Sequence, residues 1–459
     1  MEKILLIDFG STYTKLTAVS LKNEEIIGTA ASFTTVSSDI KEGYHNALAK
    51  LFAKTGELKF DKIIACSSAA GGLKMAAIGL VEELTVEAAK IVCLGAGAKV
   101  DIILSHHITN EDVENIIKKK IDIILLAGGT DGGNSECVLY NLRKLGEAHI
   151  KIPIIYAGNR SCRDEVLKIM KEYDLNGFIC DNIMAKLNLL NIEDAKNVIK
   201  QIFLSNIIVG KGIKKIEEEI DGVILPTPQA LLQGVDLLSK GYLDEEGLGE
   251  LLVFDIGGAT TDVYSLCPGE PKRGDTILKG IQEPYAKRTV EGDLGMRYSA
   301  LGVLASLNEE KLDMYKLQGI DMEKECNLRH QFVEMIPQSK HEEVVDELMA
   351  KICVDTALSR HVGKIESYYT PMGIMYLQSG KDLSDIKYII GTGGVIINSP
   401  QPKKILEAGL YNKNKMMELR PKEVKYLLDS NYILSAMGLL STISPLCALR
   451  IMKKYLVEV

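Results

Sequence analysis

Cysteine pairs and long apolar runs are missing from this sequence. Its nine cysteines are scattered, and no two of them form a Cys-x-x-Cys pair. The odd count without regular spacing argues against zinc and favours free thiols in a reducing cytoplasm. No run of about 18 apolar residues occurs, so we expect no membrane span. Asp8 interrupts the first apolar run, and we therefore expect no signal peptide.

Two common nucleotide-binding motifs and a basic surplus are also absent. Neither a Gly-x-x-x-x-Gly-Lys loop nor a Gly-x-Gly-x-x-Gly fingerprint occurs, so the P-loop and the common dinucleotide fold are not supported. Lys and Arg number 54 against 62 Asp and Glu, a net charge of −8. With no excess of positive charge to neutralise a phosphate backbone, we expect no nucleic-acid partner. The length suggests about three domains.

Two segments far apart in the chain share one design. Residues 4–15 read ILLIDFGSTYTK, and residues 251–262 read LLVFDIGGATTD. Each pattern predicts a buried strand that ends in a carboxylate, Asp8 or Asp255, and then a glycine turn with hydroxyl side chains. One such turn alone is also typical of an ordinary strand end, but two copies together indicate a nucleotide phosphate clamp.

The residue types of these turns suit phosphate and Mg²⁺. Glycine lets backbone amides approach a phosphate oxygen, hydroxyls add neutral donors, and a carboxylate at a strand end binds Mg²⁺ directly or through water. We therefore predict catalytic and metal-binding roles for Asp8 and Asp255. The predicted phosphate-binding residues are Gly10, Ser11, Thr12, Thr14, Lys15, Gly257, Gly258, Thr260 and Thr261.

A third segment, residues 387–396, reads KYIIGTGGVI. It has no carboxylate at the strand end, so metal binding is not expected there. Close backbone approach to adenine or ribose fits better, which makes Gly391, Thr392, Gly393 and Gly394 candidates for adenosine binding. The alternative is an ordinary strand-to-helix turn.

The order of these motifs resembles the superfamily of actin, sugar kinases and heat-shock chaperones. The run PTPQALLQG at 226–234 resembles the first connecting helix of that superfamily, and SAMGLL at 435–440 resembles the second. The resemblance implies an α/β fold of two actin-like lobes with duplicated ribonuclease H-like domains. It places the first lobe at 1–230, with an α/β insertion, and the second at 231–459. It also implies binding of ATP and Mg²⁺.

Three runs resemble a narrower family, the MutL accessory protein of glutamate mutase. They are IDFGSTYTK at 7–15, LLAGGTDGGN at 125–134 and RTVEGDLGMR at 288–297. The mismatch-repair protein of the same name is not resembled. The family implies an ATP-dependent accessory factor or reactivating chaperone that partners adenosylcobalamin-dependent mutase subunits and drives release of a damaged corrinoid. None of the seven histidines stands in an Asp-x-His-x-x-Gly motif, by which many cobalamin mutases hold their cofactor, so we do not expect the chain to be the mutase or its cobalamin subunit.

Leu225 departs from the pattern of the chaperones, which have a glutamate just before the Pro-Thr of the connecting helix. Slow hydrolysis, or reliance on Asp8, Asp255 and Gln229, is the consequence we expect. Other functions of the same fold stay open: a cysteine-bridged activator of a radical dehydratase, a small-molecule kinase with Asp255 as the base, and an actin-like filament. A homodimer also stays open.

The rest of the chain predicts α/β alternation followed by helices. Short apolar runs at 62–65, 91–94, 121–127, 153–157 and 177–180 predict strands, and the stretches 301–317 and 344–362 have helical spacing. The glycine-rich loop at 128–133 fits either an anion site or a tight turn with Asp131 and Asn134 as turn and cap residues. The loop at 67–72 has the same two interpretations.

Overall fold

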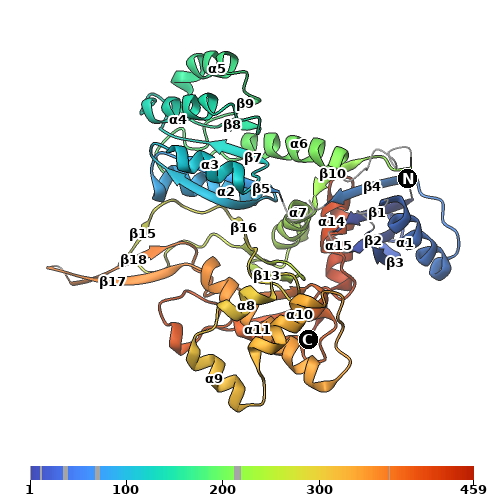
Figure 1. Cartoon of the computed structure of the whole chain (residues 1–459). Coiled ribbons are helices and arrows are strands. Elements are labelled where there is room, and N and C mark those ends of the chain that lie inside the picture. The colour runs from blue at the N-terminus through green and yellow to red at the C-terminus, as the bar shows by residue number, and fades with distance from the viewer. Residues whose placement is uncertain (1, 11–12, 35–39, 68–72, 211–218, 372) are drawn as a thin grey trace. The chain divides into compact units, whose positions relative to one another are not determined.

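The computed structural model describes residues 2–10, 13–34, 40–67, 73–210, 219–371 and 373–459 (Figure 1). Ser11, Thr12 and most of the 67–72 loop lie outside these residues. The chain divides into two compact units. Unit 1 comprises residues 1–233, 280–282 and 435–447, and unit 2 comprises residues 234–279, 283–434 and 448–459. The lobe boundary expected at residue 230 stays a prediction. Among the described residues, no helix is long and apolar enough to span a membrane.

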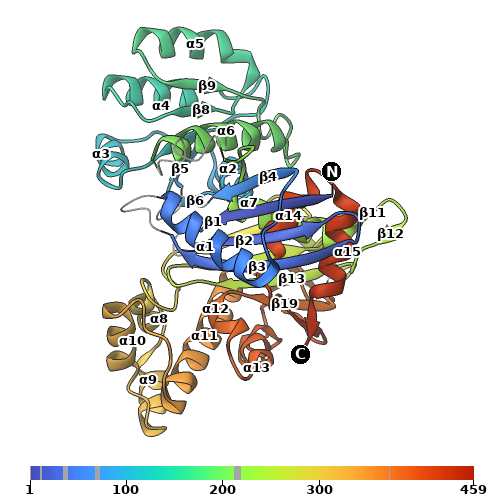
Figure 2. The same ribbon diagram turned by 90° about the vertical axis from the view of Figure 1, so that its right-hand side faces the viewer.

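Unit 1 contains a five-stranded mixed sheet with the order β10-β4-β1-β2-β3. Strand β1 runs antiparallel to β2 and parallel to β4, and β10 runs parallel to β4. Figure 2 shows strands β1 to β4 side by side, and α1 (Ile40–Thr55) packs on β2 and β3. The strands are β1 (Lys3–Phe9), β2 (Tyr13–Ser20), β3 (Glu25–Phe33), β4 (Lys62–Ser67) and β10 (Val223–Pro226).

A second sheet of unit 1 lies between β4 and β10 in the sequence. Its five strands are all parallel, in the order β6-β5-β7-β8-β9. This is a doubly wound arrangement in which the strand order reverses at β5. The strands are β5 (Lys74–Gly79), β6 (Lys99–Ser105), β7 (Ile123–Leu126), β8 (Ile154–Tyr156) and β9 (Gly177–Ile179). The helices are α2 (Glu87–Gly95), α3 (Asn110–Lys118), α4 (Glu136–Glu147), α5 (Arg163–Glu172) and α6 (Glu193–Gly210), with the short η1 (Glu82–Val86) and η2 (Arg160–Cys162).

The strand expected at 91–94 is wrong, because these residues belong to helix α2. Its buried residues include Ala88 and Ala89 as well as the run 91–94, so the helix is buried around most of its circumference. A short apolar run of this kind does not distinguish a buried helix from a strand. The other four expected strands match β4, β7, β8 and β9, whereas β5 and β6 were not anticipated.

Unit 2 repeats the strand order of the first sheet. Its six-stranded sheet has the order β16-β14-β13-β19-β20-β21. Strand β13 is antiparallel to β14 and parallel to β19, and β19 is parallel to β20, as in the first sheet. The strands are β13 (Leu251–Ile256), β14 (Thr261–Leu266), β16 (Ala286–Glu291), β19 (Tyr388–Thr392), β20 (Lys425–Leu428) and β21 (Val457–Glu458). The duplicated five-strand order confirms the expected α/β fold of two ribonuclease H-like domains.

Helices dominate the part of unit 2 between β16 and β19. The expected helix at 344–362 corresponds to α11 (Lys340–His361), but the stretch 301–317 forms two helices, α8 (Ala300–Ala305) and α9 (Glu309–Leu317). The break is an N-cap, because Asn308 Oδ1 accepts a hydrogen bond from the Lys311 amide. The remaining elements are α10 (Met322–Gln331), β15 (Thr276–Lys279), β17 (Lys364–Thr370), β18 (Gly373–Ser379), α12 (Gly394–Ile397), α13 (Pro402–Leu406), η4 (Glu407–Gly409) and η5 (Lys413–Lys415).

Two further helices begin where the sequence placed the connecting helices. They are α7 (Thr227–Lys240) and α14 (Leu434–Ser441), and α14 is followed by α15 (Pro445–Tyr455). A small hairpin, β11 (Gly241–Tyr242) with β12 (Glu245–Glu246), follows α7. Residues 227–233 of α7 and 435–441 of α14 belong to unit 1.

Candidate functional site

The β1–β2 hairpin of unit 1 places Asp8 next to a tight glycine turn. Asp8 is the penultimate residue of β1 and pairs with Lys15 of β2. The Gly10 amide donates to the Tyr13 carbonyl at 3.1 Å and closes the turn. A Cβ on Gly10 would lie 2.6 Å from the Tyr13 carbonyl oxygen, so the turn requires glycine. Thr14 is fully buried, and its hydroxyl lies 3.1 Å from the hydroxyl of Thr34.

Asp8 joins the starts of two helices that lie far from it in the sequence. The Thr227 hydroxyl, at the first residue of α7, donates to Asp8 Oδ1 at 2.6 Å. The Ser435 hydroxyl, in the first turn of α14, donates to Asp8 Oδ2 at 3.2 Å. Burial, followed by the negative charge of Asp8, raises the pKa of the neighbouring Cys66 thiol well above its usual value. Cys66 is therefore a neutral neighbour of this carboxylate at physiological pH.

The β13–β14 hairpin of unit 2 is closed by the same kind of backbone hydrogen bond. Asp255 is again the penultimate strand residue, and the amide of Gly257 donates to the Thr260 carbonyl at 2.9 Å. Asp255 is half-buried and pairs with Asp262 of β14. Asp262 is held by Arg288, whose Nε donates to Oδ1 at 2.8 Å.

A second turn packs against the glycine turn of this hairpin. The Met296 and Arg297 amides donate to the carbonyls of Gly257 and Gly258 at 3.0 and 2.8 Å. A Cβ on Gly295 would lie 2.7 Å from the Gly258 oxygen, so the two turns are in close contact. The guanidinium of Arg360 donates to both carboxylate oxygens of Asp293 at 2.7 and 2.9 Å, and this bidentate pair anchors the second turn.

The 391–394 loop follows β19 at the same end of the sheet. Strand β19 is parallel to β13, and Thr392 pairs with Asp255. Gly393 has φ +92°, and a Cβ there would lie 2.3 Å from the Ile256 carbonyl oxygen. Glycine thus lets this loop pack directly on the end of β13. The loop is also tied to the segment before α14, because the hydroxyl of Thr392 donates to Asp429 at 3.2 Å.

Three of the hydroxyls predicted to bind phosphate, those of Thr14, Thr260 and Thr261, have partners within the protein. Thr260 donates to Asp262 at 3.1 Å, and the fully buried Thr261 donates to the Leu294 carbonyl at 3.0 Å. These hydroxyls, like that of Thr14, would have to exchange partners to bind a phosphate. The backbone amides of the two turns remain the predicted phosphate donors.

The residues present fit a weakly ligated Mg²⁺ ion. Each oxygen of Asp8 accepts a hydrogen bond from one hydroxyl, which leaves lone pairs for water or a cation. Among the described residues, no group of three or more His, Cys, Asp or Glu side chains could enclose a metal. Mg²⁺ is commonly bound by one or two carboxylates together with waters and substrate phosphates, which matches this donor set. Gln229 Oε1 is buried and has no hydrogen-bond partner in the described structure.

The 128–133 loop is held by a polar network at the carboxyl ends of β7, β8 and β9. Asp131 Oδ1 accepts from the Arg160 amide and from Asn182 Nδ2, both at 2.9 Å. Burial raises the pKa of Asp131, but these hydrogen bonds outweigh it, and the net shift is downward. Asn134 Oδ1 accepts from the Cys137 amide at 3.2 Å in the first turn of α4, but the N-cap residue of this helix is Ser135. The contacts agree with Asp131 as a turn residue, and an anion site stays a prediction.

Sequence reasoning missed the side chains that join these loops to the rest of each unit. Thr227 and Ser435 lie within motifs that resembled the connecting helices, but their contacts with Asp8 span 219 and 427 residues. Arg360 and Asp429 had no motif at all. The positive charge of Arg360 near the end of a predicted helix was the sequence's only indication of a role for this residue. It did not indicate that Asp293 would be its partner.

Two ribonuclease H-like domains, each with a carboxylate and a glycine turn at the same strand end, define an actin-like ATPase-type fold. The chain belongs to the MutL family: the family described as MutL protein matches residues 4–456. A protein named MutL from Clostridium tetanomorphum is 50% identical over 462 residues, with 100% of both chains covered. This is the glutamate mutase accessory family, not the mismatch-repair protein.

Solved structures with a similar arrangement are distant. Component A of (R)-2-hydroxyglutaryl-CoA dehydratase from Acidaminococcus fermentans has 11% identity and a TM-score of 0.33, with 99% of both chains covered. Gluconate kinase from Lactobacillus acidophilus has 11% identity and a TM-score of 0.34, with 100% of this chain and 92% of the kinase covered. Because both TM-scores are low, the fold assignment rests on the strand order.

Proposed function

We propose that the chain binds ATP and Mg²⁺ through its two glycine hairpins. The observation that carries this proposal is the repeated turn: in each copy, a carboxylate is followed two residues later by a glycine whose amide donates to the carbonyl three residues further on. Asp8 and Asp255 would hold the metal, the amides after them would hold phosphates, and residues 391–394 would lie against the adenosine. Bound Mg²⁺ would neutralise phosphate charge.

The contacts of Asp8 support a coupling between nucleotide and helices. Thr227 and Ser435 donate to this carboxylate from the first turns of α7 and α14. A metal or water that takes a lone pair of Asp8 weakens or reorients these two hydrogen bonds. The presence or absence of nucleotide would thereby change the hydrogen bonds at the starts of both helices. An ATP-driven switch requires an element with two such states, and α7 and α14 would provide it.

We infer that this switch serves an adenosylcobalamin-dependent mutase of the glutamate mutase type. Membership in the MutL family supports an accessory role. The proposed task is ATP-driven release of a damaged corrinoid, so that intact cofactor can replace it. All nine cysteines are buried and none forms a disulfide, which makes a cysteine-bridged iron–sulfur cluster a poor alternative.

The test is ATP turnover by the purified protein with and without a corrinoid-blocked glutamate mutase, with corrinoid release followed by absorbance. Release that requires ATP and mutase-stimulated hydrolysis is the expected result. If the mutase does not change the rate of ATP hydrolysis and no corrinoid is released, the proposed nucleotide site stands but the mutase is rejected as the partner. Transfer of labelled phosphate to a metabolite would instead indicate a small-molecule kinase. A coloured purified protein would indicate a dehydratase activator with an iron–sulfur cluster, and ATP-dependent sedimentation would indicate an actin-like filament.

A further inference from the structure

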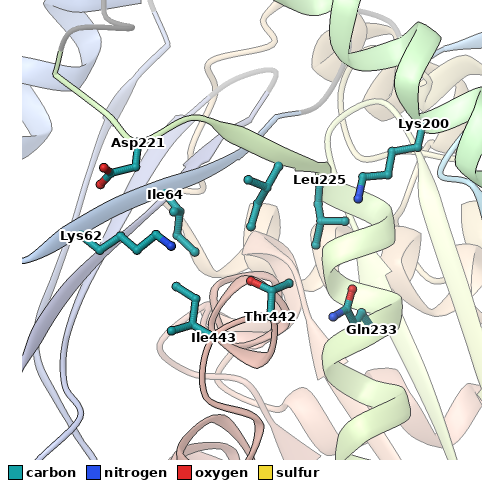
Figure 3. Close-up of a pocket in the computed structure, with 9 residues that line it drawn as sticks. Lys62, Ile64, Lys200, Asp221, Leu225, Gln233, Thr442 and Ile443 are labelled. Carbon is teal, nitrogen blue, oxygen red and sulfur yellow. The ribbon is translucent and has the colours of Figure 1, made fainter. Parts of the chain in front are cut away.

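Unit 1 contains a pocket that the proposed nucleotide site does not use (Figure 3). Its volume is about 360 Å³, within the range of about 300–1,000 Å³ found for small-molecule sites. The walls come from β4, α6, β10, α7 and the turn after α14. Four aliphatic side chains form its apolar lining: Ile64, Ile224, Leu225 and Ile443.

Two lysines supply the charge of the pocket. In Figure 3 the ammonium ends of Lys62 and Lys200 point into it from opposite sides, whereas the carboxylate of Asp221 points away. Asp221 instead accepts the Ile63 amide at 2.6 Å. Within the described part of the chain, no carboxylate lies within ion-pair distance of Lys62 or Lys200. Burial lowers the pKa of Lys200, as expected for a cation that lacks an anionic neighbour.

Two neutral polar groups complete the lining. Gln233 of α7 donates through Nε2 to the Ser441 hydroxyl at 2.9 Å, so its amide oxygen is available to accept a donor. The hydroxyl of Thr442 donates to the Leu439 carbonyl at 2.7 Å and keeps its acceptor lone pairs. Gln233, Thr442 and the two lysines thus surround a short pocket that is lined by aliphatic side chains and has an ammonium group on each side.

We propose that this pocket binds a small aliphatic dicarboxylate. Each carboxylate would meet one ammonium group, and the chain between them would lie against the four aliphatic side chains. A monocarboxylate would leave one lysine unpaired, and inorganic phosphate would leave the apolar lining exposed to water. The pocket thus selects the class of ligand through both its charge and its apolar length.

The pocket is built on the same two helices that contact Asp8. Thr227 is the first residue of α7 and Gln233 lies nearly two turns further on, while Ser435 is in the first turn of α14 and Thr442 directly follows its end. The Gln233–Ser441 hydrogen bond joins the two helices beside the pocket. A ligand that contacts both helices would therefore alter the hydrogen bonds of Asp8. This coupling rests on the proposed nucleotide function, whereas dicarboxylate binding does not.

Calorimetric titration of the full chain with succinate and glutarate tests the binding, with butyrate and inorganic phosphate as comparison ligands. We expect one dicarboxylate to bind, and Lys200→Met and Lys62→Met each to weaken its binding at least about tenfold. Lys200→Arg should retain most of the affinity. Lys168→Met, at an exposed position of α5, is the matched control. Thermal unfolding followed by circular dichroism checks that every variant folds.

Failure of both dicarboxylates to bind, or equal binding by the double variant Lys62→Met/Lys200→Met, would overturn the site. Tighter binding of phosphate or butyrate would overturn the ligand class. A separate titration with ATP tests the coupling: the bound dicarboxylate should change the ATP dissociation constant by about fivefold or more, and ATP should change the dicarboxylate constant equally. Unchanged constants would refute the coupling alone. If ATP does not bind, the proposed nucleotide function fails while dicarboxylate binding stands.

Discussion

The two hairpins share the hydrogen bond that closes the turn, but their carboxylates have different surroundings. Asp8 is buried and accepts hydroxyl bonds from two helices, with Lys15 opposite it on the next strand. Asp255 is half-buried, and the residue opposite it is Asp262, which is held by Arg288. The hydrogen bond that closes the turn has thus been repeated, whereas the side-chain contacts have not.

This difference suggests a division of labour between the two carboxylates. Replacing a buried carboxylate that accepts two hydrogen bonds lowers the stability of the protein, because the two donors lose their acceptor. A metal or water that binds such a carboxylate also changes the hydrogen bonds of those two donors. A more exposed carboxylate is easier for a metal and its waters to reach. We therefore expect Asp8 to be important for both stability and nucleotide response, and Asp255 to act chiefly in turnover.

The largest expected effect is on ATP turnover in the Asp255→Ala variant. Removing the more accessible carboxylate should lower kcat by at least about 100-fold, the scale seen when a preorganised charge-stabilising group is lost. Folding should stay intact, as judged by circular dichroism. Asp244→Ala removes an exposed carboxylate from the same unit and should change nothing. Unchanged turnover in Asp255→Ala would reject the role of that carboxylate.

The second prediction concerns the contribution of Asp8 to the stability of the protein. Asp8→Ala leaves the hydroxyls of Thr227 and Ser435 without their acceptor, which should lower the free energy of unfolding by about 1–3 kcal/mol. Thermal unfolding measures this loss. Asp8→Asn keeps an acceptor of the same size and should recover part of it. Equal unfolding midpoints for Asp8→Ala and the wild type would show that the two hydroxyl bonds do not stabilise unit 1.

The local part of this site could be predicted from the sequence, and the long-range part could not. A buried strand, a terminal aspartate and a glycine turn occupy about a dozen consecutive residues, so apolar pattern and turn chemistry specify them. The partners of Asp8 are Thr227 and Ser435, in the first turns of α7 and α14, and only the folded chain brings them to the strand end. The break between α8 and α9 shows the same limit, because periodicity continued through the Asn308 cap.

The parallel sheet between β4 and β10 gives a second measure of this limit. Strands β7 and β8 were recognised as uninterrupted apolar runs, as parallel strands buried on both faces are. Strand β5 reads KMAAIG, and its small alanines and glycine gave no such signal. Helix α2 was mistaken for a strand because it is as apolar as one. The polar network of Asp131, Asn159 and Asn182 depends on three loops that come together only in the folded sheet.

We expect the stability of unit 2 to depend on pH through a histidine packed against its six-stranded sheet. His361 is the one buried histidine among the described residues, and its ring nitrogens bond to Thr289 and Ser265 at 2.8 Å each. Burial, then the charges of Lys287 and Lys381, lowers its pKa well below 6.5. The unfolded chain therefore binds the proton first, and stability falls as pH drops below 6.5.

Between pH 6.5 and 5 this histidine should cost about 2 kcal/mol of unfolding free energy. Urea unfolding at the two pH values, followed by circular dichroism, measures the change. In His361→Gln, the loss of unfolding free energy between pH 6.5 and 5 should be smaller than in the wild type by about this amount. In His107→Gln, which replaces an exposed histidine, the loss should equal that of the wild type. An identical pH dependence in His361→Gln and the wild type would mean that His361 is protonated without unfolding.

The smallest expected effect compares the two turn glycines directly. A Cβ on Gly10 would lie 2.6 Å from the Tyr13 oxygen, but a Cβ on Gly257 would lie 3.4 Å from the Thr260 oxygen. The first distance forces the turn to shift, and the second is close to ordinary contact. Gly10→Ala should therefore lower the free energy of unfolding by about 1–2 kcal/mol, and Gly257→Ala by about 0.5 kcal/mol or less.

Gly274→Ala is the control for these two variants, because a Cβ there meets no atom within 4 Å. Thermal unfolding should rank the three variants with Gly10→Ala as the least stable. If Gly257→Ala were as damaging as Gly10→Ala, the two turns would be equally tight. The hairpins would then differ only in the contacts of their carboxylates. The ranking thus separates a difference in backbone from a difference in side-chain partners, since the alanine variants leave Asp8 and Asp255 unchanged.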